Sequence, residues 1–266
     1  MTTSRRFTNK VALITGGGTG IGAAAARRIA AEGGKVVLVG RRAEPLEAVA
    51  AECGGLAVIG DTSSEPDLVR AVKAAVATFG GLDILVANAG IEVFGSVENV
   101  PIDQWQRTLS VNLDGSMLAA RACVPAMRKR GGGSIVLVAS VAALSGAPHY
   151  VAYLTSKAAL LGLNRSLAYD YGPENIRCNA LCPGWVRTEM AERAIGEFAA
   201  AKGISLDEMI AEMVKVYPLR RIAQPDEIAS IVAFLGSADS AFMTGSVVVA
   251  DGGGAIVDVG TLAFGA

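Results

Sequence analysis

The sequence predicts an α/β fold in which one doubly wound, parallel β-sheet carries helices on both faces. Short apolar runs recur along the chain with helix-length stretches between them, and these runs do not alternate apolar with polar residues. Strands of this kind are buried on both faces, and parallel neighbours need a crossover connection, usually a helix. The runs expected to form strands are Val11–Thr15, Lys35–Gly40, Leu56–Gly60, Ile84–Asn88, Ser134–Ser140, Ile176–Cys182 and Ser246–Ala250.

Glycine residues mark where two of the expected helices end. Gly33 and Gly34 follow the helical stretch after the first run, and Gly131 to Gly133 follow the basic run 128–130. Glycine is common just past a helix C-terminus, and basic side chains in the last turn complement the helix dipole. We therefore expect a helix to end directly before each of these glycine groups.

The longest departure from this strand and helix rhythm is the segment 186–217. Within it, Ser205 and Glu208 fit a capping box at a helix start. Apolar residues then recur at helical spacing: Leu206, Met209, Ile210, Met213, Val214 and Tyr217. We expect an inserted, lid-like helical segment whose apolar stripe either closes over a substrate or packs on the protein's own core or a neighbour.

Composition argues against several classes of function. The net charge of -1 over 266 residues provides no basic surface for a polyanion, so no nucleic-acid partner is expected. A single histidine, His149, and four cysteines without a C-x-x-C pair argue against a metal site. Neither a signal-peptide apolar region nor an apolar run of membrane-spanning length occurs. We expect one cytoplasmic domain over residues 1–266, with no membrane partner.

A glycine-rich loop follows the first strand and opens the first helix. It reads Thr15-Gly16-Gly17-Gly18-Thr19-Gly20-Ile21-Gly22. Glycine allows a sharp turn, close approach of a pyrophosphate to the backbone and tight packing of helix on strand, while the helix N-terminus attracts the anion. A strand, loop and helix in this order predict a dinucleotide site.

The spacing T-G-x-x-x-G-x-G resembles that of the short-chain dehydrogenase/reductase family, in its branch of about 250 residues with a single Rossmann domain. The resemblance extends over almost the whole chain. Further matching motifs are Asp61-Thr62, Asn88-Ala89-Gly90, Asn112, Ser140, Tyr153-x-x-x-Lys157, Pro183-Gly184 with Thr188, and Asp251-Gly252-Gly253. The resemblance implies an NAD(P)-dependent oxidoreductase that interconverts a secondary alcohol and a ketone, acting as a homotetramer.

Tyr153 and Lys157 are four residues apart, which places both on one helix face if residues 153–171 are helical. Tyrosine has a reference pKa of about 10, so a base role requires a neighbouring positive charge that favours the phenolate. The resemblance implies that Tyr153 is the general acid/base, that Lys157 also holds the nicotinamide ribose, that Ser140 binds the substrate oxygen, and that Asn112 organises a water molecule linking Lys157 to solvent. Taken singly, each residue also has a purely structural interpretation.

The end of the second strand bears on the choice between NADP and NAD. Gly40 stands where an NAD site usually has a carboxylate, and Arg41 and Arg42 follow it. Arginine suits a ribose 2′-phosphate, so NADP(H) is favoured and NAD(H) remains possible, since the guanidinium could also be a surface group. The cofactor contacts implied by the resemblance are Gly16, Gly18, Thr19, Gly20, Ile21, Gly22, Gly40, Arg41, Arg42, Asp61, Thr62, Asn88, Ala89, Gly90, Tyr153, Lys157, Pro183, Gly184, Val186 and Thr188.

Expected walls of the substrate pocket are mostly apolar or small, which suggests a ketone or secondary alcohol with a sizeable apolar part. Glu92 either contacts a polar substrate group or is a solvated rim residue. The expected substrate contacts are Ser140, Val141, Ala142, His149, Tyr150, Tyr153 and Trp185.

The chain ends in an apolar segment, 255–264, that we expect to dock at a subunit interface. Two other functions stay open. One is a non-catalytic nucleotide-sensing protein, which would be signalled by loss of Ser140, Tyr153 or Lys157, and all are present. The other is an epimerase or dehydratase on the same scaffold.

Overall fold

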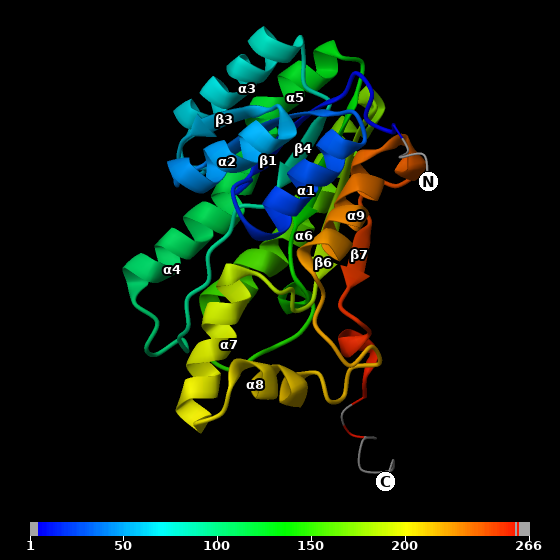
Figure 1. Ribbon diagram of the computed structural model, residues 1–266. Coiled ribbons are helices and arrows are strands. Elements are labelled where there is room, and N and C mark those ends of the chain that lie inside the picture. The colour runs from blue at the N-terminus through cyan, green and yellow to red at the C-terminus, as the bar shows by residue number, and fades with distance from the viewer. Residues whose placement is uncertain (1–4, 259, 261–266) are drawn as a thin grey trace.

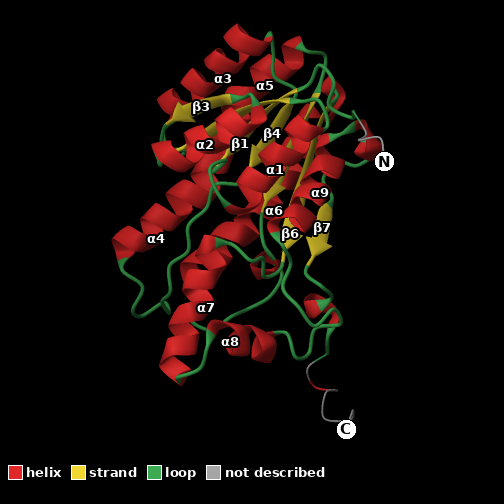
Figure 2. Cartoon of the chain, in the orientation of Figure 1, coloured by secondary structure: helices red, strands yellow, loops and turns green. Residues whose placement is uncertain are grey.

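A parallel sheet of seven strands forms the centre of the protein, in the order β3-β2-β1-β4-β5-β6-β7. This computed structural model describes residues 5–258 and 260 (Figures 1 and 2). Each expected apolar run forms one strand, so the predicted doubly wound parallel sheet is confirmed. The strands are β1 (Val11–Thr15), β2 (Lys35–Gly40), β3 (Leu56–Ile59), β4 (Ile84–Ala87), β5 (Gly133–Val138), β6 (Ile176–Pro183) and β7 (Val247–Ala250). The strand order reverses between β1 and β4, and such reversal points bind ligands in open α/β sheets.

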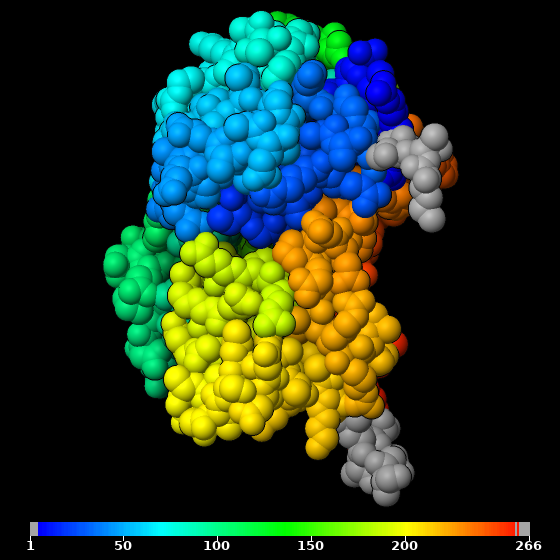
Figure 3. All heavy atoms as spheres, viewed as in Figure 1, coloured from blue at the N-terminus to red at the C-terminus, as the bar shows by residue number. Residues whose placement is uncertain are grey.

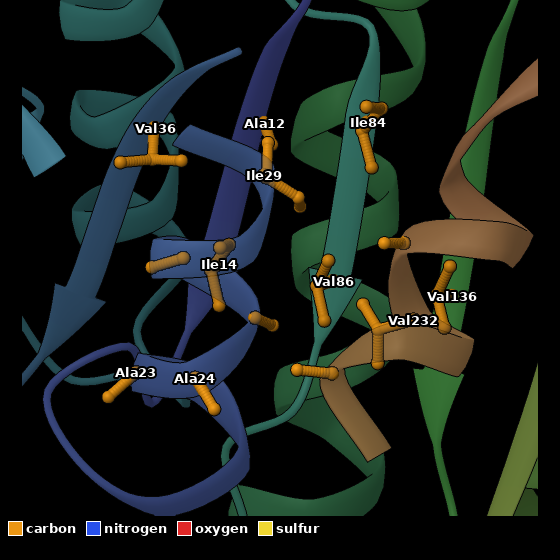
Figure 4. Close-up of a cluster of buried hydrophobic side chains, with 14 of the residues drawn as sticks. Ala12, Ile14, Ala23, Ala24, Ile29, Val36, Ile84, Val86, Val136 and Val232 are labelled. Carbon is orange, nitrogen blue, oxygen red and sulfur yellow. The ribbon is translucent and has the colours of Figure 1, made fainter. Parts of the chain in front are cut away.

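Helices cover both faces of the sheet because successive strand residues point to opposite sides. In β1, Ala12 and Ile14 belong to a buried cluster that includes α1, α2 and α9, as the close-up in Figure 4 shows for part of it. Val11 and Leu13 belong to a second cluster with α3, α5 and α6. The helices are α1 (Gly20–Ala31), α2 (Ala43–Cys53), α3 (Glu65–Phe79), α4 (Ile102–Leu109), α5 (Gly115–Lys129), α6 (Val151–Tyr171), α7 (Glu189–Lys202), α8 (Leu206–Met213) and α9 (Pro225–Gly236).

The glycines expected to end helices do so. Gly33, with φ +92, and Gly131, with φ +80, take the left-handed conformation just past α1 and α5. Side chains with a Cβ rarely adopt this conformation, so glycine at these points lets the chain turn back toward the next strand.

The inserted segment 186–217 contains two helices, where the sequence had singled out only the second. α8 starts with the expected capping box: Ser205 N donates to Glu208 Oε2 (2.8 Å), and Glu208 N donates to Ser205 Oγ (3.3 Å). Ile210 and Val214 are buried against α7, and Met209 and Met213 pack on the same cluster. The apolar stripe therefore packs largely on the protein's own α7, and Tyr217 at its end also lines the large cleft at the carboxyl ends of the strands. The two helices form the yellow part of the surface in Figure 3.

Part of the expected C-terminal docking segment, residues 259 and 261–264, lies outside the described residues. Within the described part of the segment, Ile256 is 82% exposed. Over residues 5–258 and 260, no helix combines the length and apolarity that a membrane crossing needs. The same residues contain no cluster of three or more His, Cys, Asp or Glu side chains arranged to hold a metal ion.

Candidate active site

A cleft of about 710 Å³ opens at the carboxyl ends of the strands, between the sheet and the start of α7. It continues toward the ends of β2 and β3 as a smaller space of about 180 Å³. Together, these spaces are lined by most residues expected to bind a cofactor or substrate. The expected residues in the larger cleft are Gly16, Thr19, Gly20, Ile21, Arg41, Arg42, Asn88, Ala89, Gly90, Ser140, Val141, Ala142, Tyr150, Tyr153, Lys157, Pro183, Gly184, Trp185, Val186 and Thr188. The smaller space adds Gly18, Gly40, Asp61 and Thr62.

The glycine-rich loop is held in place from β4. Asn88 Nδ2 donates to Thr15 O (3.0 Å) and Gly16 O (3.2 Å), and Thr15 Oγ1 accepts from Asn88 N (3.0 Å). Gly22 faces this junction, where an added Cβ would lie 2.3 Å from Gly16 O. Gly22 therefore allows α1 to pack closely on the loop, and the described contacts of Asn88 hold the loop itself.

Asp61, at the far end of the smaller space, is oriented by two partners. Its Oδ1 accepts from Ser63 N (2.9 Å) and Ser63 Oγ (2.7 Å), and its Oδ2 accepts from Arg107 Nη2 (2.7 Å). Burial alone would raise the pKa of Asp61, but the hydrogen bonds from Ser63 and the Arg107 charge outweigh it and hold the pKa at about 2. The carboxylate is charged at neutral pH and ready to accept a hydrogen bond. Arg107 is not among the site residues predicted from the sequence.

The two arginines after β2 differ in their surroundings. Arg42 pairs with Glu189 at the start of α7 (Nη2 to Oε2, 3.0 Å) and donates to Thr19 Oγ1 (3.2 Å). Arg41 is exposed, lines both spaces, and makes no ion pair with any residue in the described part of the chain. Arg41 is therefore the guanidinium free to meet an anion.

Lys157 and Tyr153 lie together on α6, on the floor of the larger cleft. Lys157 is 4% exposed, its Nζ donates to Val138 O (2.8 Å), and that nitrogen is 5.7 Å from the centre of the Tyr153 ring. Burial lowers the pKa of Lys157 to about 8. Burial also raises the pKa of Tyr153 to about 12, against the effect of a hydrogen bond with Ser140. Burial thus outweighs the effect that favours the phenolate, and the tyrosine is a neutral phenol at pH 7.

Ser140 stands two residues beyond β5, where it caps the short helix 141–143. Its Oγ accepts from Ala142 N (3.1 Å), which leaves the hydroxyl hydrogen available for another partner. The hydroxyl reaches Tyr153 as well. Ser140 and Tyr153 therefore present two hydroxyl groups to the same part of the cleft.

Asn112 lies behind this group in a π-helical turn, Ser110–Asp114, between α4 and α5. It is fully buried, accepts from Ile91 N (2.8 Å) and donates to Ile91 O (2.9 Å) and Ser156 Oγ (2.9 Å). These bonds tie the loop after β4 to α6 beside Lys157. A π-turn inside a helix is rare and frequent at functional sites. The water molecule that Asn112 is expected to organise, linking Lys157 to solvent, stays a prediction.

The start of α7 packs against the glycine-rich loop. Thr188 Oγ1 accepts from Ala191 N (3.3 Å) and so caps α7, while an added Cβ on Gly20 would lie 3.1 Å from the Thr188 Cγ2 atom. The preceding bend needs Gly184, where a Cβ would lie 2.8 Å from Asp251 Cα.

Aromatic side chains line up beside the expected substrate end. The ring centres of Phe94 and Tyr150 are 4.5 Å apart, those of Phe94 and Phe198 5.4 Å, and those of Tyr150 and Tyr153 5.9 Å. Neither Phe94 nor Phe198 is among the site residues predicted from the sequence. His149 is exposed and is not among the residues that line the cleft; its backbone oxygen accepts from Gly95 N (2.7 Å).

A family model described as enoyl-(acyl carrier protein) reductase matches residues 16–254. Human dehydrogenase/reductase SDR family member 4 is 40% identical over 260 residues, covering 95% of this chain and 90% of that protein. Cyclohexanol dehydrogenase from Acinetobacter sp. (strain SE19) is 40% identical over 256 residues, covering 94% and 96%.

Solved structures agree with these matches. Levodione reductase has a TM-score of 0.90 at 35% identity, covering 95% of this chain and 100% of that one. L-sorbose reductase from Gluconobacter frateurii, solved in complex with NADPH and L-sorbose, has a TM-score of 0.89 at 31% identity, covering 95% and 98%.

Proposed function

This chain belongs to the short-chain dehydrogenase/reductase family, and we propose that it interconverts a ketone and a secondary alcohol with NADP(H) as the favoured cofactor. The observation that carries the proposal is the meeting of Ser140, Tyr153 and Lys157 with the glycine-rich loop in one cleft. A nucleotide-sensing protein has no need of a phenol, a hydroxyl and a buried ammonium group converging there.

The cleft has the features that a dinucleotide requires. The glycine-rich loop and the N-terminus of α1 border it, which suits a pyrophosphate. Asp61 is a fixed acceptor for the adenine amino group, and Arg41 is a free cation at the place where a ribose 2′-phosphate would lie. Arg42 is already paired with Glu189, so the preference for NADP(H) rests on Arg41. The related L-sorbose reductase was solved with NADPH.

A bound nicotinamide cofactor supplies or accepts the hydride. In ketone reduction, the Ser140 hydroxyl donates a hydrogen bond to the substrate oxygen, and Tyr153 gives that oxygen a proton. The high pKa of Tyr153 keeps the phenol protonated at neutral pH, as a general acid requires. The Lys157 ammonium lies 5.7 Å from the Tyr153 ring centre and stabilises the phenolate left after transfer. Alcohol oxidation runs the same proton path in reverse.

The walls beyond the reacting groups favour a substrate with an apolar part. Trp185, Met190 on α7 and Leu154 line this end of the cleft. Met209 and Met213 of α8 pack on the cluster that α8 shares with α7, whereas Met190 of α7 lines the cleft. Cyclohexanol dehydrogenase, a relative at 40% identity, is named for a cyclic alcohol.

The proposal is tested with cyclohexanone, its 4-alkyl derivatives of increasing length, and the corresponding alcohols, each with NADPH and with NADH. We expect activity that rises with apolarity and a Tyr153→Phe variant slower by at least about 100-fold. Normal turnover by Tyr153→Phe would contradict the proton path. Equal activity along the alkyl series would contradict the apolar pocket.

A further inference from the structure

Two polar atoms at the substrate end of the cleft are sealed from solvent and unsatisfied. Glu92 Oε1 and the Tyr150 hydroxyl have no hydrogen-bond partner among the described residues, although both residues line the cleft. Buried polar atoms are nearly always paired, because an unpaired one loses its hydration without compensation. Two polar atoms without hydrogen-bond partners in the wall of a binding cleft are expected when a ligand supplies the missing hydrogen-bonding group.

The segments that carry these two atoms are well fixed. Glu92 lies in the loop after β4, and Tyr150 directly precedes α6. The loops are joined where Gly95 N donates to His149 O (2.7 Å). The Tyr150 ring centre is 5.9 Å from that of Tyr153, and the charge of Glu92 is close enough to raise the pKa of Tyr153. Glu92 Oε1 and the Tyr150 hydroxyl therefore lie close to Tyr153, which we propose exchanges a proton with the reacting oxygen of the substrate.

The surrounding charges define what the pair can bind. Burial raises the pKa of Glu92, Arg193 in the cleft wall lowers it, and Glu197 raises it further. Burial and the Glu92 charge also raise the pKa of Tyr150, which therefore stays a phenol. The Tyr150 hydroxyl lies near enough to Glu92 to lower the Glu92 pKa as a hydrogen-bond donor does, although neither Glu92 Oε1 nor the Tyr150 hydroxyl has a described partner at full hydrogen-bond distance. The wall thus offers an acceptor oxygen beside a group that both donates and accepts.

We propose that Glu92 and Tyr150 recognise a hydroxyl group of the substrate, distinct from the oxygen that reacts at Ser140 and Tyr153. The substrate hydroxyl donates to Glu92 Oε1 and accepts from the Tyr150 hydroxyl. This inference rests on the proposed function and narrows its substrates to hydroxy ketones and the matching diols that also carry an apolar part. The burial of Glu92 Oε1 argues against the alternative of a solvated rim residue.

The experiment compares kcat/KM for cyclohexanone with kcat/KM for 2-, 3- and 4-hydroxycyclohexanone. We expect the wild-type enzyme to prefer at least one hydroxylated ketone by about 10-fold or more, because a site built for a hydroxyl rejects the analogue that lacks it. Glu92→Leu and Tyr150→Phe should each reduce that preference by about 10-fold. Glu92→Gln, which keeps the size and an acceptor oxygen, should reduce it less and provides a readout if the leucine variant does not fold.

Glu98→Leu is the matched control, because Glu98 is exposed on the same loop and forms no hydrogen bond or ion pair with the described residues. It should leave the preference unchanged. Equal efficiency of the wild-type enzyme on all four ketones, or equal loss on all four in both the Glu92→Gln and Tyr150→Phe variants, would overturn the inference and leave the proposed function standing. Failure to reduce any ketone with either cofactor would instead overturn the proposed function, and the inference with it.

Discussion

Burial moves the pKa values of Tyr153 and Lys157 so that both neutral forms become easier to reach. The pKa of Tyr153 rises to about 12, and that of Lys157 falls to about 8. At pH 7, the phenol is therefore protonated, whereas the lysine is still largely an ammonium ion. This combination suits proton donation to a ketone oxygen, with a positive charge beside the phenolate that forms.

The lowered pKa of Lys157 predicts the pH dependence of ketone reduction. The ammonium form exists below the pKa, so kcat/KM should be flat below about pH 8 and fall as the pH rises through it. A pH profile of the wild-type enzyme under saturating cofactor checks this. We expect the Lys157→Arg variant to be slower than the wild-type enzyme. Because its guanidinium stays charged, its kcat/KM should not decrease near pH 8. A wild-type profile that stays flat to pH 9.5 would contradict the assignment.

The free guanidinium of Arg41 leads to a prediction about cofactor preference. Arg41→Ala should raise KM for NADPH by about 10- to 100-fold and change KM for NADH little, because only NADPH carries the 2′-phosphate. Arg42→Ala is the matched comparison. Its guanidinium is paired with Glu189, so we expect a smaller difference between the two cofactors. If Arg42→Ala raises KM for NADPH relative to KM for NADH more than Arg41→Ala does, the roles of the two arginines are reversed.

At the scale of elements, α7 and α8 stabilise one another more than they are stabilised by the sheet. Ala191 and Ile195 of α7 share a buried cluster with Ile210 of α8, separate from the two clusters that flank the sheet. α7 also contributes Met190 and Arg193 to the cleft wall. Loosening α8 should therefore disturb the substrate end of the cleft without unfolding the sheet.

Ser205→Ala tests this coupling. Loss of an N-cap costs about 1 kcal/mol. The substitution removes the two bonds of the Ser205 hydroxyl, from Glu208 N and to Glu208 Oε2, and leaves the bond from the backbone Ser205 N to Glu208 Oε2. We expect faster amide hydrogen exchange over residues 189–213 and a raised KM for the ketone, with exchange in β1 and β4 unchanged. Ser230→Ala on α9 is the control, because the Ser230 hydroxyl bonds Asp226 O and Arg28 of α1 and has no described bond to α7 or α8. Uniformly faster exchange throughout the protein would show that α7 and α8 are not an independent unit.

At the scale of the whole molecule, the fold could be predicted because strands of a sheet buried on both faces appear in the sequence as continuous apolar runs. The continuous apolar runs identified every strand. α7 also left signals that were passed over: Thr188 caps its start, Glu189 lies in its first turn, and Gly203 follows its end in the left-handed conformation. These residues fit the ordinary rules for helix ends.

The parts of the site that could not be predicted depend on contacts between distant segments. Arg107 reaches Asp61 over 46 residues of chain, and Phe94 meets Phe198 over an even longer separation. The sequence around each of these residues contains no pattern that predicts its contact partner. The burial of Glu92 Oε1 is similar, because a loop glutamate is normally solvated. The groups that act on Glu92, namely Tyr150 and the α7 residues Arg193 and Glu197, are distant from it in the sequence.

The outer edge of the sheet bears on the expected homotetramer. β7 is one of the two edge strands. Val247 and Val249 on it are 37% and 45% exposed, and Phe242 in the preceding loop is fully exposed. An exposed apolar edge strand invites association, so we propose that β7 lies at a subunit interface. Sedimentation equilibrium should give four times the chain mass of 27.2 kDa. Val249→Lys should shift this toward smaller species, whereas Val97→Lys, at a site 81% exposed in another loop, should not. A wild-type monomer, or equal behaviour of the two variants, would exclude this edge as the interface.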